Sequence, residues 1–239
     1  MNSTQQLTSY IKNGTPCIFV KYGDGEYNAA NFYEGCNCDG TPYTKNLGEK
    51  LIESFIYNSQ QSNSMLGKWD MDVSLSRFWE SLVNVKINWV DFTTIIMNFG
   101  KPHQTYMDKI EFFKTIKQSN LKKIYIANAK MHRAKELLNL DHHIIIDSSN
   151  WFDTEYSSVF NSIKTTVGDS GDNTLILVSG GMGAKYLISE LHKCYPTAIY
   201  IDIGSSLDSI CTKNKTRAGS WSYEGYCIYF KELLPEGWD

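Results

Sequence analysis

The chain has 239 residues, of which 42% are hydrophobic and 21% charged, as in ordinary globular proteins. A formal net charge of −3 argues against a basic nucleic-acid-binding surface, so we expect no nucleic-acid partner. No apolar run approaches the roughly 20 residues that span a bilayer, and residues 1–6 are polar, unlike a signal peptide. We therefore expect a cytoplasmic protein without a membrane span, folded as one domain over residues 1–239.

Short apolar runs rich in Ile, Val, Tyr or Phe recur along the chain and mostly end at small or polar residues. Such runs are typical of buried parallel strands. The predicted strands are Cys17–Tyr22, Thr94–Phe99, Lys123–Asn128, His143–Asp147, Thr174–Ser179 and Ala198–Ile203, with Tyr226–Lys231 as a candidate edge strand.

Between these runs, apolar residues recur at offsets of three and four, which is typical of helices that pack one face on a sheet. The predicted helices are Asn46–Gln61, Tyr106–Gln118, Met131–Leu138, Thr154–Val167 and Gly183–Cys194. This alternation predicts an α/β fold with a Rossmann-like, mostly parallel sheet and helices on both faces. Ligands of such sheets bind at the carboxyl ends of the strands, so the residues after each strand are candidates for a site.

The first predicted strand is followed by Gly23-Asp24-Gly25-Glu26. Gly23 and Gly25 accept backbone angles closed to other residues and let a ligand approach closely. Asp24 and Glu26 could share Mg²⁺ or Mn²⁺, because such ions take one or two carboxylates and complete their shell with phosphate and water. The alternative is a tight turn whose acids cap the next helix. The position of both glycines directly after a buried strand favours the metal site.

A second glycine-rich turn, with Ser179, Gly180 and Gly181, follows a predicted strand and leads to a helix that begins near Lys185. Backbone N–H groups in such a turn could hold a phosphate or a sugar hydroxyl. The turn lacks the ending of a P-loop and the spacing of the dinucleotide fingerprint. Close packing of the helix on the strand explains the glycines equally well.

Asp202 lies inside the apolar run Ala198–Ile203, and Asp208 follows that run. Burial of an unpaired carboxylate is unfavourable, so Asp202 is expected to orient a ligand, act as a base or bond to nearby amides. Asp208 could instead be a solvated helix residue. After another strand come Asn150 and Trp151, and the aromatic ring could stack on a base or sugar, or only anchor the next helix.

The segment Phe19-Val20-Lys21-Tyr22-Gly23-Asp24-Gly25-Glu26 resembles the "R-[FY]-G-D-G-E" segment of glycosyltransferases with the GT-D fold. Leu175–Lys185 followed by Ala198–Asp208 is similar to the C-terminal half of that family, and the resemblance runs in order from about residue 17 to 208. It departs from the family at Lys21, where arginine is frequent. It also departs at Ser205-Ser206, where some members carry histidine after Asp-Ile-Gly.

The resemblance implies a transferase for a hexose or deoxyhexose, with a nucleoside diphosphate sugar, UDP-linked, as donor and a glycan hydroxyl as acceptor. It implies that Asp24 and Glu26 bind Mn²⁺ or Mg²⁺ and the donor diphosphate. It also points to Gly180, Gly181 and Arg217 for the donor and places Asp202 beside the active site. An inverting enzyme needs a general base for the acceptor hydroxyl, and Asp202 and Asp208 are the candidates. Lys21, Lys130 and Lys185 could assist the diphosphate. A metal-dependent phosphohydrolase and a non-catalytic nucleotide-sugar-binding module remain as alternatives.

Overall fold

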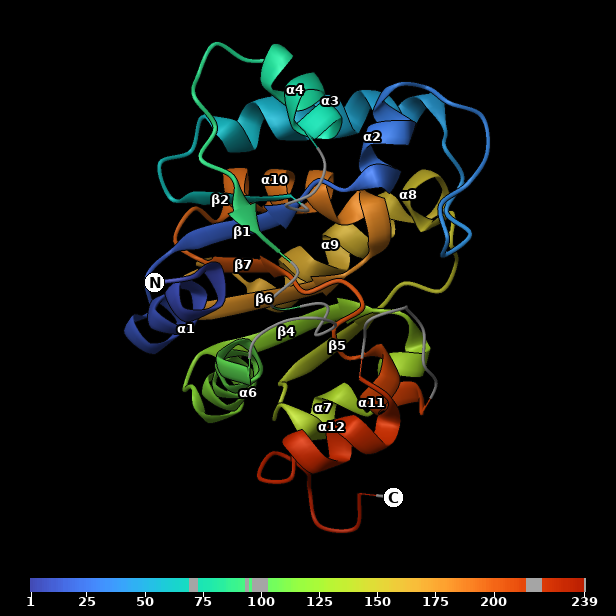
Figure 1. The fold of residues 1–239 in the computed structure, drawn as a ribbon. Helices are drawn as coiled ribbons and strands as arrows, with labels where there is room; N and C mark the ends of the chain where they lie inside the picture. Colours follow the sequence, from blue (N-terminus) through green and yellow to red (C-terminus); the bar gives the residue numbers. More distant parts are fainter. Residues whose placement is uncertain (69–72, 93–94, 96–102, 214–220, 239) are drawn as a thin grey trace.

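A computed structural model describes residues 1–68, 73–92, 95, 103–213 and 221–238. In these ranges, one seven-stranded sheet has the order β3-β2-β1-β7-β6-β4-β5, and every pair of neighbouring strands is parallel (Figure 1). The strands are β1 (Cys17–Lys21), β2 (Ser64–Lys68), β3 (Val90–Asp91), β4 (Lys122–Ala127), β5 (His142–Ile145), β6 (Thr174–Ser179) and β7 (Ile199–Asp202).

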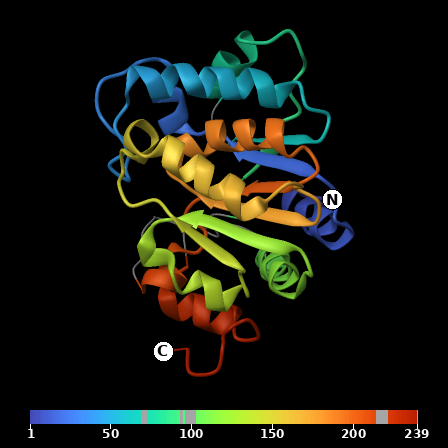
Figure 2. The same ribbon diagram turned by 180° about the vertical axis from the view of Figure 1, so that it is seen from behind.

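Helices pack on both faces of this sheet (Figures 1 and 2). One face carries α1 (Ser3–Asn13), α6 (His103–Gln118), α7 (Ala134–Leu137), α11 (Asp208–Thr212) and α12 (Tyr223–Tyr229). The other carries α2 (Asp24–Ala30), α3 (Lys45–Ser59), α4 (Val73–Ser81), α8 (Trp151–Thr154), α9 (Tyr156–Val167) and α10 (Ala184–Cys194). The short 3₁₀ helices η1 (Ala129–Met131) and η2 (Gly181–Gly183) follow β4 and β6. Among the described helices, none is long and apolar enough to cross a membrane.

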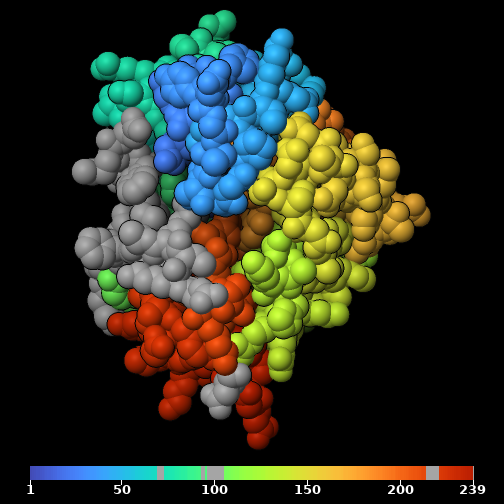
Figure 3. Space-filling model, turned by 90° about the vertical axis from the view of Figure 1, so that its right-hand side faces the viewer, coloured from blue at the N-terminus to red at the C-terminus, as the bar shows by residue number. Residues whose placement is uncertain are grey.

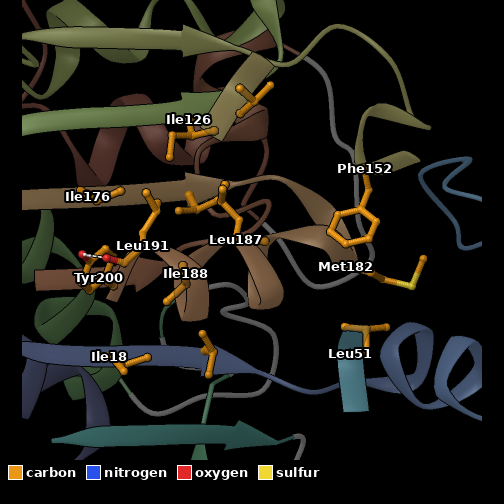
Figure 4. Close-up of a cluster of buried hydrophobic side chains, with 14 of the residues drawn as sticks. Ile18, Leu51, Ile126, Phe152, Ile176, Met182, Leu187, Ile188, Leu191 and Tyr200 are labelled. Carbon is orange, nitrogen blue, oxygen red and sulfur yellow. Dashed lines mark hydrogen bonds between the residues drawn. The ribbon is translucent and has the colours of Figure 1, made fainter. Parts of the chain in front are cut away.

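The strands are apolar throughout because each face has its own core. In β1, Cys17 and Phe19 point to one core, and Ile18 and Val20 point to the other. Figure 4 shows part of the second core, where Ile18 and Ile176 of the sheet lie on the side of α10 that carries Leu187, Ile188 and Leu191. The α/β fold with a parallel sheet covered on both faces is therefore confirmed.

Five of the six main predicted strands correspond to β1, β4, β5, β6 and β7. The prediction for Thr94–Phe99 falls outside the described residues apart from Ile95, which is buried. The strands β2 and β3 were not predicted, because Ser-Met-Leu-Gly-Lys has a short apolar core and β3 has only two residues.

The prediction of an edge strand at Tyr226–Lys231 is wrong. These residues mostly belong to helix α12, whose first turn is capped by Ser222, with the Gly225 N–H donating to its hydroxyl at 3.2 Å. Tyr226 and Phe230 are both buried and lie four residues apart, so they share one face of the helix. Aromatic enrichment indicated a strand, but the apolar spacing and the cap favour a helix.

Helix α2, which begins at Asp24, packs unusually close to α3. A Cβ added to Gly48 of α3 would lie 2.3 Å from the carbonyl oxygen of Ala29 in α2. The two helix backbones therefore touch at a residue that has no side chain, and this contact fixes the position of α2 above the end of β1.

We expect Gly48→Ala to destabilise the protein by about 1–3 kcal/mol, because the added methyl group forces α2 away from α3. Urea denaturation measures the change in the free energy of unfolding. The control is Glu49→Ala, an exposed position on the same helix, for which we expect a change within about 0.5 kcal/mol. Equal free energies of unfolding for the two variants would contradict a close contact between α2 and α3.

Candidate active site

A pocket of about 510 Å³ lies at the carboxyl ends of the central strands. Its walls come from the segments that follow β1, β4, β5, β6 and β7, which are far apart in the sequence. In Figure 3 the hollow lies between the blue segment near residues 30–45 and the yellow segment near residue 150, with orange atoms visible at its bottom. The strand ends thus meet where the α/β topology predicts a ligand site.

Most of the site residues expected from the sequence line this pocket. They are Gly23, Asp24, Gly25, Glu26, Ser179, Gly180, Gly181 and Asp208. Lys185 and Asp202 lie beneath these residues, fully buried. Asn150 is not among the described residues that line the pocket, although its neighbour Trp151 is. Arg217 lies outside the described residues.

A buried cluster of ionic side chains joins the turns after β1, β6 and β7. The ammonium group of Lys185 lies 2.5 Å from Glu26 Oε1 and 2.9 Å from Asp202 Oδ2. Lys21 Nζ lies 3.5 Å from Asp202 Oδ1. The two lysines and two acids have no net formal charge, which permits their burial.

Lys185 occupies an unfavourable place for a cation, in the first turn of α10, where the helix dipole is positive. Its ammonium group also donates to the carbonyl oxygen of Gly181 at 2.9 Å. Burial lowers the pKa of Lys185, but Asp202 and Glu26 outweigh this effect and raise it. The lysine is therefore charged because the two carboxylates hold it.

Both carboxylate oxygens of Asp202 contact a cation, Oδ1 that of Lys21 and Oδ2 that of Lys185. Besides the lysines, its Oδ1 accepts a hydrogen bond from the Gly204 N–H at 3.1 Å. Its side chain is fully buried at the end of β7. Such a carboxylate positions the turn after β7 and the lysines around it.

The two acids of Gly23-Asp24-Gly25-Glu26 take different positions. Glu26 Oε2 accepts a hydrogen bond from the Gly23 N–H at 2.8 Å, which closes the first turn of α2, and its other oxygen faces Lys185. Burial alone would raise the pKa of Glu26, but Lys185 and Lys21 lower it to about 2. Asp24, in contrast, is exposed at the pocket wall.

The turn after β6 is held by an aromatic side chain. Trp151 is 3% exposed, and its Nε1 donates to the carbonyl oxygen of Gly180 at 3.1 Å. A Cβ on Gly183 would lie 2.9 Å from the Trp151 ring and 2.7 Å from the Phe152 ring. Both aromatic rings therefore anchor helix α8 against this turn, and at least Gly183 is explained by close packing.

The donor atoms at the pocket fit a hard divalent ion that is completed by a substrate. In the described part of the chain, no group of three or more His, Cys, Asp or Glu could hold a metal ion. Mg²⁺ and Mn²⁺ sites do not require such a group, since one or two carboxylates with phosphate oxygens and water suffice. Asp24 offers an exposed carboxylate, and Glu26 lines the same wall.

Sequence reasoning missed one wall of the pocket, a short hairpin of residues 35–42, which we call the 35–42 hairpin. Asn37, Cys38, Asp39 and Thr41 of this hairpin line the pocket. The segment shows neither helical nor strand periodicity, and no strand directly precedes it. Its glycines and Asx residues are typical of turns, and nothing in the segment points to its contact with the strand ends.

No family model matches the sequence, and no curated protein is significantly similar to it. Among solved structures, a domain of unknown function 1792 is 15% identical with a TM-score of 0.61, over 97% of this chain and 88% of that one. A domain 1792 structure described as a distinct glycosyltransferase fold is 16% identical with a TM-score of 0.60, over 98% and 93%. A glycosyltransferase (DUF1792) from Streptococcus sanguinis is 16% identical with a TM-score of 0.59, over 97% and 92%. The chain therefore has the fold of these domains, and the resemblance inferred from the sequence is confirmed for the fold.

We expect Lys185→Met to destabilise the protein by about 3–5 kcal/mol, because it leaves Glu26 and Asp202 buried without their main cation. The matched control is Lys193→Met on the same helix, whose exposed ion pair with Glu190 contributes less than about 1 kcal/mol. Chemical denaturation of both variants gives the comparison. Wild-type stability of Lys185→Met would contradict a supporting role for the cluster.

The lowered pKa of Glu26 makes its contribution to stability depend on pH in a defined direction. The contribution is fully present above the ordinary pKa of 4.5 and is lost as the pH falls towards about 2, where the folded protein binds the proton. The free energy of unfolding of wild type should therefore exceed that of Glu26→Gln at pH 6, and the gap should shrink between pH 4.5 and about 2. A gap that stays constant over this range would contradict the ion pair.

Proposed function

We propose that this chain is a glycosyltransferase that moves a hexose or deoxyhexose from a UDP-linked donor to a hydroxyl group of a glycan, with Mn²⁺ or Mg²⁺ bound. The proposal depends mainly on the pocket at the strand ends, which is lined by the exposed Asp24 carboxylate and by Lys21 and Lys130. The fold supports this proposal, because a solved structure that is described as a glycosyltransferase has the same fold. A nucleoside diphosphate requires such cations or a metal ion around its phosphate oxygens.

The chemical demand is to stabilise the leaving diphosphate, which gains negative charge as its bond to the anomeric carbon breaks. Asp24 and Glu26 would hold the divalent ion, which supplies Lewis-acid stabilisation of that charge when bound. Lys21 and Lys130 line the pocket and add positive charge near the phosphates. Lys185 lies below the pocket, so its contribution is to hold Glu26 in place.

The acceptor oxygen forms the new bond to the anomeric carbon, and its proton must pass to a base if the reaction inverts the configuration. Asp208 and Asp202 are the candidates from the sequence. Asp208 lines the pocket and is partly exposed, whereas Asp202 is buried and paired with Lys185. We therefore assign the base to Asp208 and a positioning role to Asp202.

The test measures acceptor-dependent UDP release and the glycosidic product, with UDP-sugars found by a thermal-shift screen in Mn²⁺. We expect Asp24→Asn to lower transfer by about a hundredfold or more, because it removes the exposed carboxylate that would hold the ion. Its thermal stability should stay near that of wild type. The control, Asp169→Asn, removes an exposed acid before β6 at the opposite end of the sheet and should leave transfer unchanged.

Each of three other results would contradict a different part of the proposal. Transfer at the wild-type rate by Asp24→Asn, or after exhaustive EDTA treatment, would exclude the metal role. Inorganic phosphate without a glycosidic product would indicate a phosphohydrolase. Binding of UDP-sugars without acceptor-dependent UDP release from any glycan of a broad panel would indicate a non-catalytic binding module.

A further inference from the structure

The 35–42 hairpin forms one wall of the pocket and lies beside the turns that follow β1, β5 and β6. An antiparallel bridge between Cys36 and Pro42 closes it, and the Asn37 N–H donates to the carbonyl oxygen of Thr41 at 2.8 Å. Its tip reaches the loop after β5, since a Cβ on Gly40 would lie 3.8 Å from the Ser149 side chain. Figure 3 shows the blue segment that includes the hairpin next to the yellow one at the edge of the hollow.

Two side chains of the hairpin stand against the glycines of the two turns. A Cβ on Gly25 would lie 2.9 Å from Asn37 Oδ1, and a Cβ on Gly181 would lie 3.0 Å from Asp39 Oδ2. Asn37 and Asp39 therefore occupy the close approach to these turns that a ligand was expected to use. The hairpin therefore contacts the turn after β1 through Asn37 and the turn after β6 through Asp39.

The carboxylate of Asp39 is oriented by its own turn. Asp39 Oδ1 accepts a hydrogen bond from the Thr41 N–H at 3.0 Å, and Oδ2 faces Gly181. A phosphate bound at the Gly180–Gly181 turn would lie against this negative charge and be repelled. A sugar hydroxyl, in contrast, would donate a charge-assisted hydrogen bond to it.

We propose that Asp39 is a specificity-determining residue that binds hydroxyl groups of the donor sugar at the Gly180–Gly181 turn and excludes sugars that carry a carboxylate. The inference rests on the proposed function. It places the neutral sugar at the Gly180–Gly181 turn beside Asp39, and the diphosphate at the end of β1 beside Asp24 and Lys21. The proposal thus assigns the second glycine-rich turn to the sugar rather than to a phosphate.

The experiment compares binding of UDP, UDP-glucose and UDP-glucuronate to the full chain in Mn²⁺ by calorimetry. In Asp39→Asn the amide oxygen still accepts from the Thr41 N–H, so the hairpin keeps its turn while the charge is lost. We expect wild type to bind UDP-glucose more tightly than UDP-glucuronate. Asp39→Asn should lower the affinity for UDP-glucose about ten- to hundredfold and leave the affinity for UDP unchanged. The ratio of the affinities for UDP-glucose and UDP-glucuronate should therefore be smaller than in wild type.

The matched control is Glu34→Gln, which removes an exposed acid just before the hairpin that does not line the pocket. It should bind all three nucleotides as wild type does. Unchanged UDP-glucose affinity in Asp39→Asn, or an equal loss for UDP and UDP-glucose, would overturn the inference while the proposed function stands. If wild type bound none of the three nucleotides, the UDP-linked donor would fail and the inference with it.

Discussion

The geometry of the pocket depends on one buried ammonium group. Lys185 connects the turn after β1, through Glu26, to the end of β7, through Asp202. These elements are neighbours in the sheet, but their carboxylates could not both be ionised in a dry interior without a cation between them. Because Glu26 lies in the first turn of α2, the same ion pair sets the place of Asp24 at the pocket wall.

This arrangement divides the work between the two acids of one short motif. Glu26 has one oxygen on the Gly23 N–H and the other on Lys185, so much of its negative charge is already neutralised. Asp24 retains an exposed carboxylate. A metal ion at this turn would therefore draw its charge mainly from Asp24 and from substrate phosphates, which matches the preference of Mg²⁺ and Mn²⁺ for few protein ligands.

Features set by local pattern could be predicted from the sequence, and features set by distant contacts could not. The apolar runs of β1, β4, β5, β6 and β7 were recognisable because both faces of the sheet are covered. The polar residues after them could then be placed at one edge. A buried acid at position 202 implied a partner, but the pattern did not choose Lys185 over solvent or ligand. Part of helix α12 has the aromatic composition of a strand, because aromatic side chains suit both structures, and so composition alone predicts the wrong element there.

The 35–42 hairpin changes the meaning of the glycines that the sequence makes conspicuous. Gly25 and Gly181 lie directly against other side chains, since a Cβ on Gly25 would lie 2.9 Å from Asn37 Oδ1 and one on Gly181 would lie 3.0 Å from Asp39 Oδ2. A side chain at Gly183 would likewise meet the rings of Trp151 and Phe152, and one at Gly48 would meet the backbone of α2. Glycines near a strand end can therefore record the approach of another part of the chain instead of a phosphate. The ligand then meets the side chains that the glycines admit, and in this pocket one of those side chains is a carboxylate.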